Sequence, residues 1–204
     1  MKSSGEKKIF LSIETTTGVF SLAIGNSREV LVEERIPGRK HSEKLITGIK
    51  SALEESKLHI KDIDAVSVGT GPGSLTGIRI GVSAGVTLAQ ILDVPLYGIS
   101  SMDIAGKKAS NPVIKAFRDK YYHAEYDEEG NRVKPFHIID SEKVDKIGGV
   151  EVEISPAEIL KETEKLYEQK ADGNWKEIEP VYVMDTVYKE KKKGSINKED
   201  KNNE

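Results

Sequence analysis

The chain has 204 residues and contains no cysteine. This absence excludes a disulfide framework, a cysteine nucleophile, an iron–sulfur site and any zinc site with cysteine ligands. No apolar run approaches the roughly 20 residues of a membrane span. The first apolar run, residues 9–13, is far shorter than the hydrophobic part of a signal peptide. We therefore expect a cytoplasmic protein that makes no membrane contact.

Histidines at the spacing of metal ligands are also missing. Two histidine ligands on one helix lie four residues apart. Four residues after His41 the chain has Leu45, and four residues after His123 it has Asp127, on a predicted strand where such positions stand far apart. We therefore expect no metal site. The four histidines are His41, His59, His123 and His137.

Composition indicates a globular protein whose charge is unevenly distributed. Apolar residues make up 37% of the chain and charged residues 32%, a balance that is typical of a soluble fold with a real core. Residues 1–8 and 189–204 each carry a net charge of +2, and the body between them a net charge of −7. An acidic body binds polyanions poorly by itself. The basic ends are either arms for nucleic acid or, as we favour, solvated tails.

The order strand, strand, strand, helix is predicted twice, which indicates α/β architecture in two lobes or, less favoured, one mixed sheet. The first copy has strands at 9–13, 19–24, 30–36, 63–68 and 94–99, with helices at 42–56 and 75–92. The second has strands at 113–117, 121–126, 133–139 and 178–183, with a helix at 155–169. The predicted division is an N-terminal tail at 1–8, lobes at 9–106 and 107–188, and a tail at 189–204.

A glycine-rich loop, GTGPGSLTG over residues 69–77, joins a predicted strand to a predicted helix. Such a loop can present backbone N–H groups to an anion, but it lacks the lysine of a Walker A loop and the third glycine of a dinucleotide fingerprint. A phosphate site and a tight turn remain equally open. A carboxylate at the end of the first strand could hold Mg²⁺, although a polar turn is favoured there. The candidate nucleotide-binding residues are Glu14, Thr15, Gly71 and Gly73.

Glycine recurs at every fourth position into the predicted helix at 75–92, so these glycines share one face. Each glycine inside a helix costs about 1 kcal/mol relative to alanine, and a close backbone approach is the usual compensation. The neighbour is the chain's own sheet, its helix at 42–56, or a helix of another chain. The spacing alone slightly favours the chain itself. The four glycines are Gly73, Gly77, Gly81 and Gly85.

Four segments together resemble the TsaB family. They are ETT at 14–16, RKHSEKL at 39–45, GTGPGSLTGIRIG at 69–81 and GISS at 98–101. The third is the most specific, and the resemblance runs from about residue 8 to 106 and more loosely to 184. It implies an actin/Hsp70-like fold of two ribonuclease H-like lobes with the C-terminal lobe reduced.

The resemblance also implies a function and partners. It implies a non-catalytic subunit in the formation of N6-threonylcarbamoyladenosine at position 37 of tRNAs that read codons starting with A. The paralogue TsaD transfers the threonylcarbamoyl group, TsaB pairs with it as a scaffold, and the ATPase TsaE docks on the pair. A homodimer when alone, contact with tRNA only through the complex, and ATP and a divalent metal held by the partners are implied as well.

The family builds its interface from the helices at about 42–56 and 75–92, so the resemblance favours another chain as the neighbour of the glycine face. TsaD carries a paired-histidine metal motif where this chain has His41 and Leu45, which implies that the metal site is lost. The predicted interface residues are His41, Leu45, Ile49, Gly73, Gly77, Gly81 and Gly85.

The chain departs from the family at three places. The family's Asp-Thr-Ser is ETT at 14–16, a segment like Asp-Ala-Arg is KAFR at 115–118, and the closing Pro-x-Tyr-Leu-Arg is PVYVM at 180–184. Two alternative functions remain. One is an independent enzyme of the same fold, either a small-molecule kinase or a metallopeptidase, and the other is a direct tRNA binder that uses its lysine-rich tails.

Overall fold

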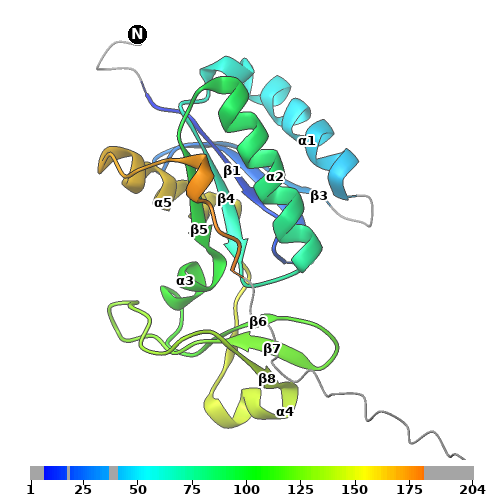
Figure 1. The fold of residues 1–204 in the computed structure, drawn as a ribbon, viewed down its shortest axis with the longest axis vertical. Coiled ribbons are helices and arrows are strands. Elements are labelled where there is room, and N and C mark those ends of the chain that lie inside the picture. Colours follow the sequence, from blue (N-terminus) through cyan, green and yellow to red (C-terminus); the bar gives the residue numbers. More distant parts are fainter. Residues whose placement is uncertain (1–6, 18, 37–40, 182–204) are drawn as a thin grey trace, which may run out of the picture.

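The part of the molecule that the structure describes has two sheets, which lie one above the other in Figure 1, and helices that pack against them. The computed structural model describes residues 7–17, 19–36 and 41–181, and only the backbone of residues 41–43. The first sheet has the order β3-β2-β1-β4-β5, from β1 (Phe10–Glu14), β2 (Phe20–Gly25), β3 (Val30–Ile36), β4 (Ala65–Gly71) and β5 (Leu96–Ser100). The second has the order β8-β7-β6-β9, from β6 (Pro112–Lys115), β7 (Lys120–His123), β8 (His137–Asp140) and β9 (Val150–Glu151).

Five α-helices and three short 3-10 turns complete the described elements. The helices are α1 (His41–Ser56), α2 (Leu75–Leu92), α3 (Ser101–Gly106), α4 (Ser141–Val144) and α5 (Pro156–Glu168). The turns are η1 (Ile60–Asp62), η2 (Asp145–Ile147) and η3 (Trp175–Glu177). The expected helices at 42–56 and 75–92 are therefore confirmed.

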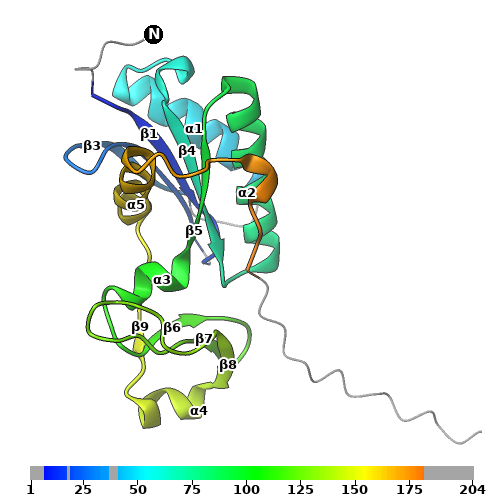
Figure 2. The ribbon, with the colours of Figure 1, turned by 60° about the vertical axis from the view of Figure 1, so that its left-hand side comes forward.

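The central strands of the first sheet are buried on both faces. Leu11 packs with residues of α1 and α2, whereas Phe10 packs with Leu160 of α5, because neighbouring strand residues point to opposite faces. Figure 2 shows α5 on one side of this sheet and α2 on the other. Burial on both faces explains why β1, β2 and β4 are mostly apolar in the sequence and buried at every position.

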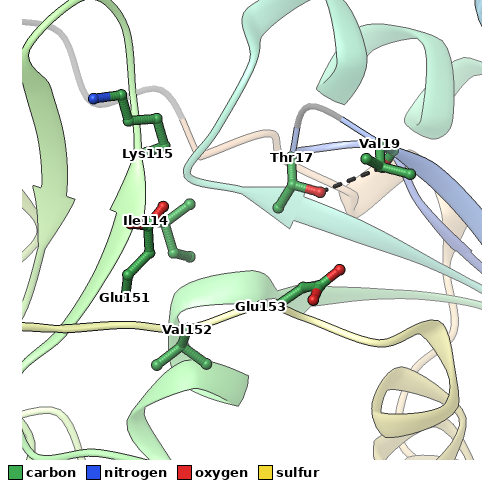
Figure 3. A pocket seen from close by; sticks show the side chains of 7 residues that line it. All are labelled: Thr17, Val19, Ile114, Lys115, Glu151, Val152 and Glu153. Atoms are coloured by element: carbon green, nitrogen blue, oxygen red, sulfur yellow. Dashed lines mark hydrogen bonds between the residues drawn. The ribbon is translucent and has the colours of Figure 1, made fainter. Parts of the chain in front are cut away.

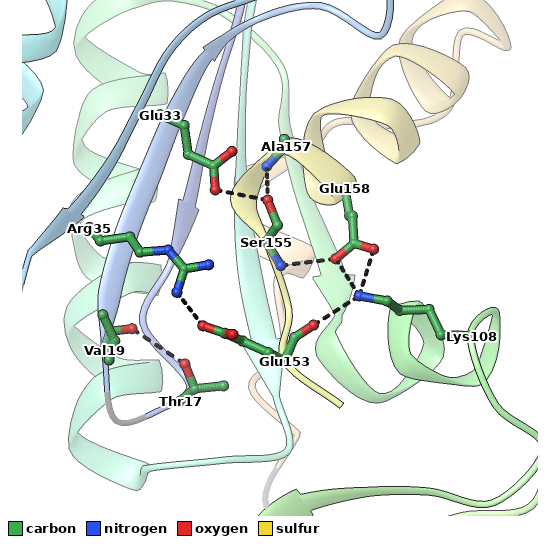
Figure 4. Close-up of polar contacts among 9 residues, drawn as sticks. All are labelled: Thr17, Val19, Glu33, Arg35, Lys108, Glu153, Ser155, Ala157 and Glu158. Carbon is green, nitrogen blue, oxygen red and sulfur yellow. Dashed lines mark hydrogen bonds and ion pairs between the residues drawn. The ribbon is translucent and has the colours of Figure 1, made fainter. Parts of the chain in front are cut away.

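Helix α5 follows the second sheet in sequence but packs on the first one. It begins with Ser155 as its N-cap, closed by a capping box with Glu158. The segment that leads to it is held by polar contacts (Figure 4): Glu153 pairs with Arg35 of β3, and Lys108 Nζ lies 2.8 Å from a carboxylate oxygen of Glu158. In space, the first lobe therefore includes a helix from beyond the predicted boundary at residue 106.

The second lobe has shorter strands than the sequence predicts. The expected strand at 121–126 ends at His123, and Tyr126 forms only an isolated bridge with Arg132 while its ring lies against Gly106. The expected strand at 133–139 begins only at His137, and the two-residue strand β9 is not predicted. Of the expected strand at 178–183, residues 178–181 form no strand, and the remainder lies outside the described residues.

The glycine face of α2 packs on the chain itself. A Cβ on Gly77 would lie 1.9 Å from the backbone oxygen of Thr15, and one on Gly81 would lie 2.2 Å from the Thr15 hydroxyl oxygen. The corresponding distances are 2.1 Å from Gly73 to the Thr16 oxygen and 2.4 Å from Gly85 to Val68 Cγ1. The expectation that these glycines contact another chain is therefore wrong, because the turn after β1 and the sheet occupy their face.

By length and composition alone, α2 would also suit a membrane span, with a mean hydropathy of 1.4 over 18 residues. A single such helix is weak evidence, since a core helix of a globular domain passes the same test. Of this stretch, 28% is buried, and the buried residues pack on the first sheet.

Replacing Gly77 by alanine tests the close approach of α2. The new methyl group would meet a backbone oxygen that cannot rotate away, so we expect the free energy of unfolding to fall by more than about 2 kcal/mol in urea denaturation. Ser83 is exposed on the same helix, and Ser83→Ala should change stability little. A Gly77→Ala variant as stable as Ser83→Ala would contradict the packing described here.

Candidate functional site

The ends of β1 and β4 lie beside the start of α3, where polar side chains meet in the interior. The Glu14 side chain is fully buried at the end of β1. One of its carboxylate oxygens accepts from the backbone N–H of Thr16, and the other accepts from the Ser101 hydroxyl at 2.8 Å. The hydroxyl oxygens of Thr16 and Ser101 are 3.0 Å apart. These contacts tie the end of β1 to the first turn of α3.

Burial controls the ionisation of Glu14. Desolvation raises the pKa of this carboxyl group, and the hydrogen bonds from Thr16 and Ser101 oppose the rise only in part. No ion pair with Glu14 forms among the residues that the structure describes. The carboxyl group therefore serves as a buried hydrogen-bonding centre.

The four predicted nucleotide-binding residues do come together, but they face inward. Thr15 is fully buried and donates its hydroxyl hydrogen to the Gly77 oxygen at 2.8 Å. Gly71 and Gly73 are buried as well, and the Gly73 oxygen accepts from the Tyr122 hydroxyl at 3.2 Å. The nucleotide site at these residues stays a prediction, and the polar side-chain atoms of Glu14 and Thr15 are engaged inside the chain.

An open cleft of about 400 Å³ lies between the two lobes instead (Figure 3). Lys115 contributes one positive charge, and Glu151 and Glu153 contribute two negative charges. This balance disfavours a polyphosphate ligand. None of the four predicted residues lines the cleft, whose lining is Thr17, Val19, Ile114, Lys115, Glu151, Val152 and Glu153.

Residues of α1 and α2 form an apolar groove of about 350 Å³, which we call the α1–α2 outer face. Ile46 is 59% exposed in this groove, although aliphatic side chains usually cluster in the core. The chain places a cation, Arg79, beside the apolar residues. The groove is lined by Leu45, Ile46, Arg79, Ile80, Ser83 and Ala84.

This surface differs from the predicted interface. Leu45 and Ile49 are buried in the core of the first lobe, although Leu45 also forms part of the groove's floor. The side chain of His41 lies outside the described residues. The predicted interface residues do not include Ile46, which is exposed, or Ile80, which is half-buried against the core.

The two sheets, with polar side chains buried at the ends of β1 and β4, identify the class of the protein. It is a two-lobed α/β protein of the actin-like type with a reduced second lobe. The solved structure of YeaZ from Pseudomonas aeruginosa superposes with a TM-score of 0.71 at 18% sequence identity, covering 86% of this chain and all of that one. That likeness confirms the expected fold.

Sequence comparison identifies the family. Residues 33–189 match the family described as TsaD: tRNA N6-adenosine threonylcarbamoyltransferase. An uncharacterised protein of Mycobacterium tuberculosis is 34% identical over 122 residues. The "tRNA threonylcarbamoyladenosine biosynthesis protein TsaB" of Escherichia coli is 29% identical over 131 residues, or 60% of this chain and 57% of that one. The chain belongs to the TsaB family within this group.

The match does not span the relatives completely. The aligned part is 57% of this chain and 58% of the Mycobacterium tuberculosis protein. The aligned part of the Bacillus subtilis TsaB protein is 54% of its length, at 29% identity.

Replacing Glu14 by glutamine tests its buried state. Because folding raises the pKa of this carboxyl group, the native state retains a proton that the unfolded chain has lost. The resulting stability is full below the unfolded pKa and declines as the pH rises toward the folded pKa. Glutamine cannot ionise, so in urea denaturation the stability of Glu14→Gln relative to the wild type should rise as the pH increases above the unfolded pKa.

Glu128 is an exposed glutamate and provides the control for that measurement. Glu128→Gln should follow the wild-type pH profile. If Glu14→Gln follows it too, the carboxyl group ionises as freely in the folded chain as in the unfolded one, and the account of Glu14 fails.

Proposed function

We propose that this chain is a non-catalytic scaffold subunit in the formation of N6-threonylcarbamoyladenosine in tRNA, and that it pairs with a TsaD-like protein. The observation that carries the proposal is the α1–α2 outer face, with Ile46 exposed beside Ile80. Exposed apolar surface bordered by charge is typical of a protein interface. The pathway is inferred from the relatives named as TsaB biosynthesis proteins.

The burial of polar groups at the strand ends supports a subunit without its own chemistry. Glu14 and Thr15 hydrogen-bond within the chain, and Leu45 packs in the core where the TsaD motif has a histidine. Under this proposal the partners hold ATP and the divalent metal. A TsaE-like ATPase docks on the pair.

Charge supports a route to tRNA through the complex. The body of the chain is acidic, so it lacks the excess of lysine and arginine that drives binding to phosphates. The partner then provides the basic surface. In the absence of the partner, the same α1–α2 outer face pairs two copies of this chain. We place the complex in the cytoplasm.

Calorimetric measurement of the affinity of the purified chain for a TsaD-like protein tests the interface. Ile46→Asp places a charge in the apolar groove at a position that is 59% exposed, so the fold should persist while the affinity falls at least tenfold. Val133 is 57% exposed on the second lobe and offers a matched control. Val133→Asp should bind like the wild type.

Two outcomes would overturn this assignment. Equal affinities for Ile46→Asp and the wild type would show that the partner binds elsewhere. Turnover of a small substrate by the isolated chain, abolished by Glu14→Ala in a variant that remains folded, would favour an independent enzyme of the same fold.

A further inference from the structure

Two histidines face each other across the second sheet. His123, the last residue of β7, pairs in register with His137, the first residue of β8. Nδ1 of His123 lies 3.2 Å from Nε2 of His137, and the ring centroids are 4.9 Å apart at an interplanar angle of 89°. The two strands therefore hold two imidazole nitrogens at a fixed separation.

This separation matches that of two ligands of one metal ion. Two nitrogens bound to a tetrahedral Zn²⁺ at their usual bond lengths lie about 3.3 Å apart, and the centroids of their rings about 5 Å apart. In a collinear N–H···N hydrogen bond of 3.2 Å the centroids would be about 5.5 Å apart. The observed 4.9 Å is close to the value for two ligands, and without an ion the same two nitrogens form a hydrogen bond.

The surroundings prepare His137 to act as a ligand. Its Nδ1 lies 3.2 Å from the backbone oxygen of Pro135. A carbonyl oxygen can only accept a hydrogen bond, so Nδ1 carries the proton and the lone pair of Nε2 points toward His123. Histidines that bind metals are usually oriented by such a contact. His137 is also exposed, which gives an ion access from solvent.

The charge state of His123 also suits metal binding. Burial lowers the pKa of this imidazole, and His137 and Lys134 lower it further, while Glu125 raises it. His123 is thus neutral at physiological pH, and neutral imidazole is the form that binds metals. Glu125 and Lys134, the charged groups nearby, pair with each other at 2.6 Å. His123 Nε2 is buried without a partner. Metal binding at Nδ1 would move the ring proton from Nδ1 to this nitrogen.

We propose that His123 and His137 together bind one divalent transition-metal ion such as Zn²⁺, with water completing its coordination. No group of three or more histidine, aspartate or glutamate side chains is placed to hold a metal among the described residues, so the chain supplies two ligands. Such a site is weaker than one with three or four protein ligands. A bound ion would link β7 to β8 and stabilise the smaller lobe.

Titration of the full chain with Zn²⁺ in competition with a chromophoric chelator tests the site. The wild type should bind one equivalent, and His137→Gln should bind it at least tenfold more weakly. His137 is exposed, so the variant should fold normally. His59 is exposed in another part of the fold, and His59→Gln should keep the wild-type affinity.

Thermal unfolding gives an independent readout. Zn²⁺ should raise the Tm of the wild type and of His59→Gln, but not that of His137→Gln or His123→Gln. Equal Zn²⁺ affinity in the wild type and His137→Gln would overturn the proposal, as would an equal loss of affinity in His59→Gln. Pairing with a TsaD-like protein does not enter this test, so its outcome is separate from that of the proposed function.

Discussion

The fold depends on the close approach of α2 to the turn after β1. Gly77 allows the helix backbone to lie against the Thr15 oxygen, and Thr15 in turn donates its hydroxyl hydrogen to the Gly77 oxygen. No side chain larger than hydrogen fits between the two backbones. The loss of helix propensity at the glycines is compensated by this packing. The same contact fixes the helix so that its opposite side faces away from the sheet.

Two consequences for function follow from that contact. The strand ends, where proteins of α/β type usually bind ligands, are closed by Thr15, Thr16 and Ser101 around the buried Glu14. The Tyr122 hydroxyl, on the second sheet, donates a hydrogen bond to the Gly73 oxygen and so covers the strand ends further. An accessible apolar surface remains on the α1–α2 outer face, which under our proposal receives the protein partner.

The sequence predicts the first lobe well and the details of contact poorly. Apolar periodicity locates α1 and α2, and the four-residue glycine repeat indicates a close approach without identifying the neighbour. Ile46 is hard to predict as exposed because an apolar residue is normally assigned to the core. His123 and His137 are fourteen residues apart, and only the register of β7 with β8 brings them together. Ligand spacing along the chain cannot show a pair formed across strands.

Hydrogen–deuterium exchange of the chain with and without a TsaD-like partner tests where the partner binds. Binding should slow exchange in α1 and α2, whose side chains line the apolar groove, and should leave β6, β7 and β8 of the second lobe unchanged. Protection confined to the second lobe, or to the cleft residues around Glu151 and Glu153, would show that the partner binds elsewhere.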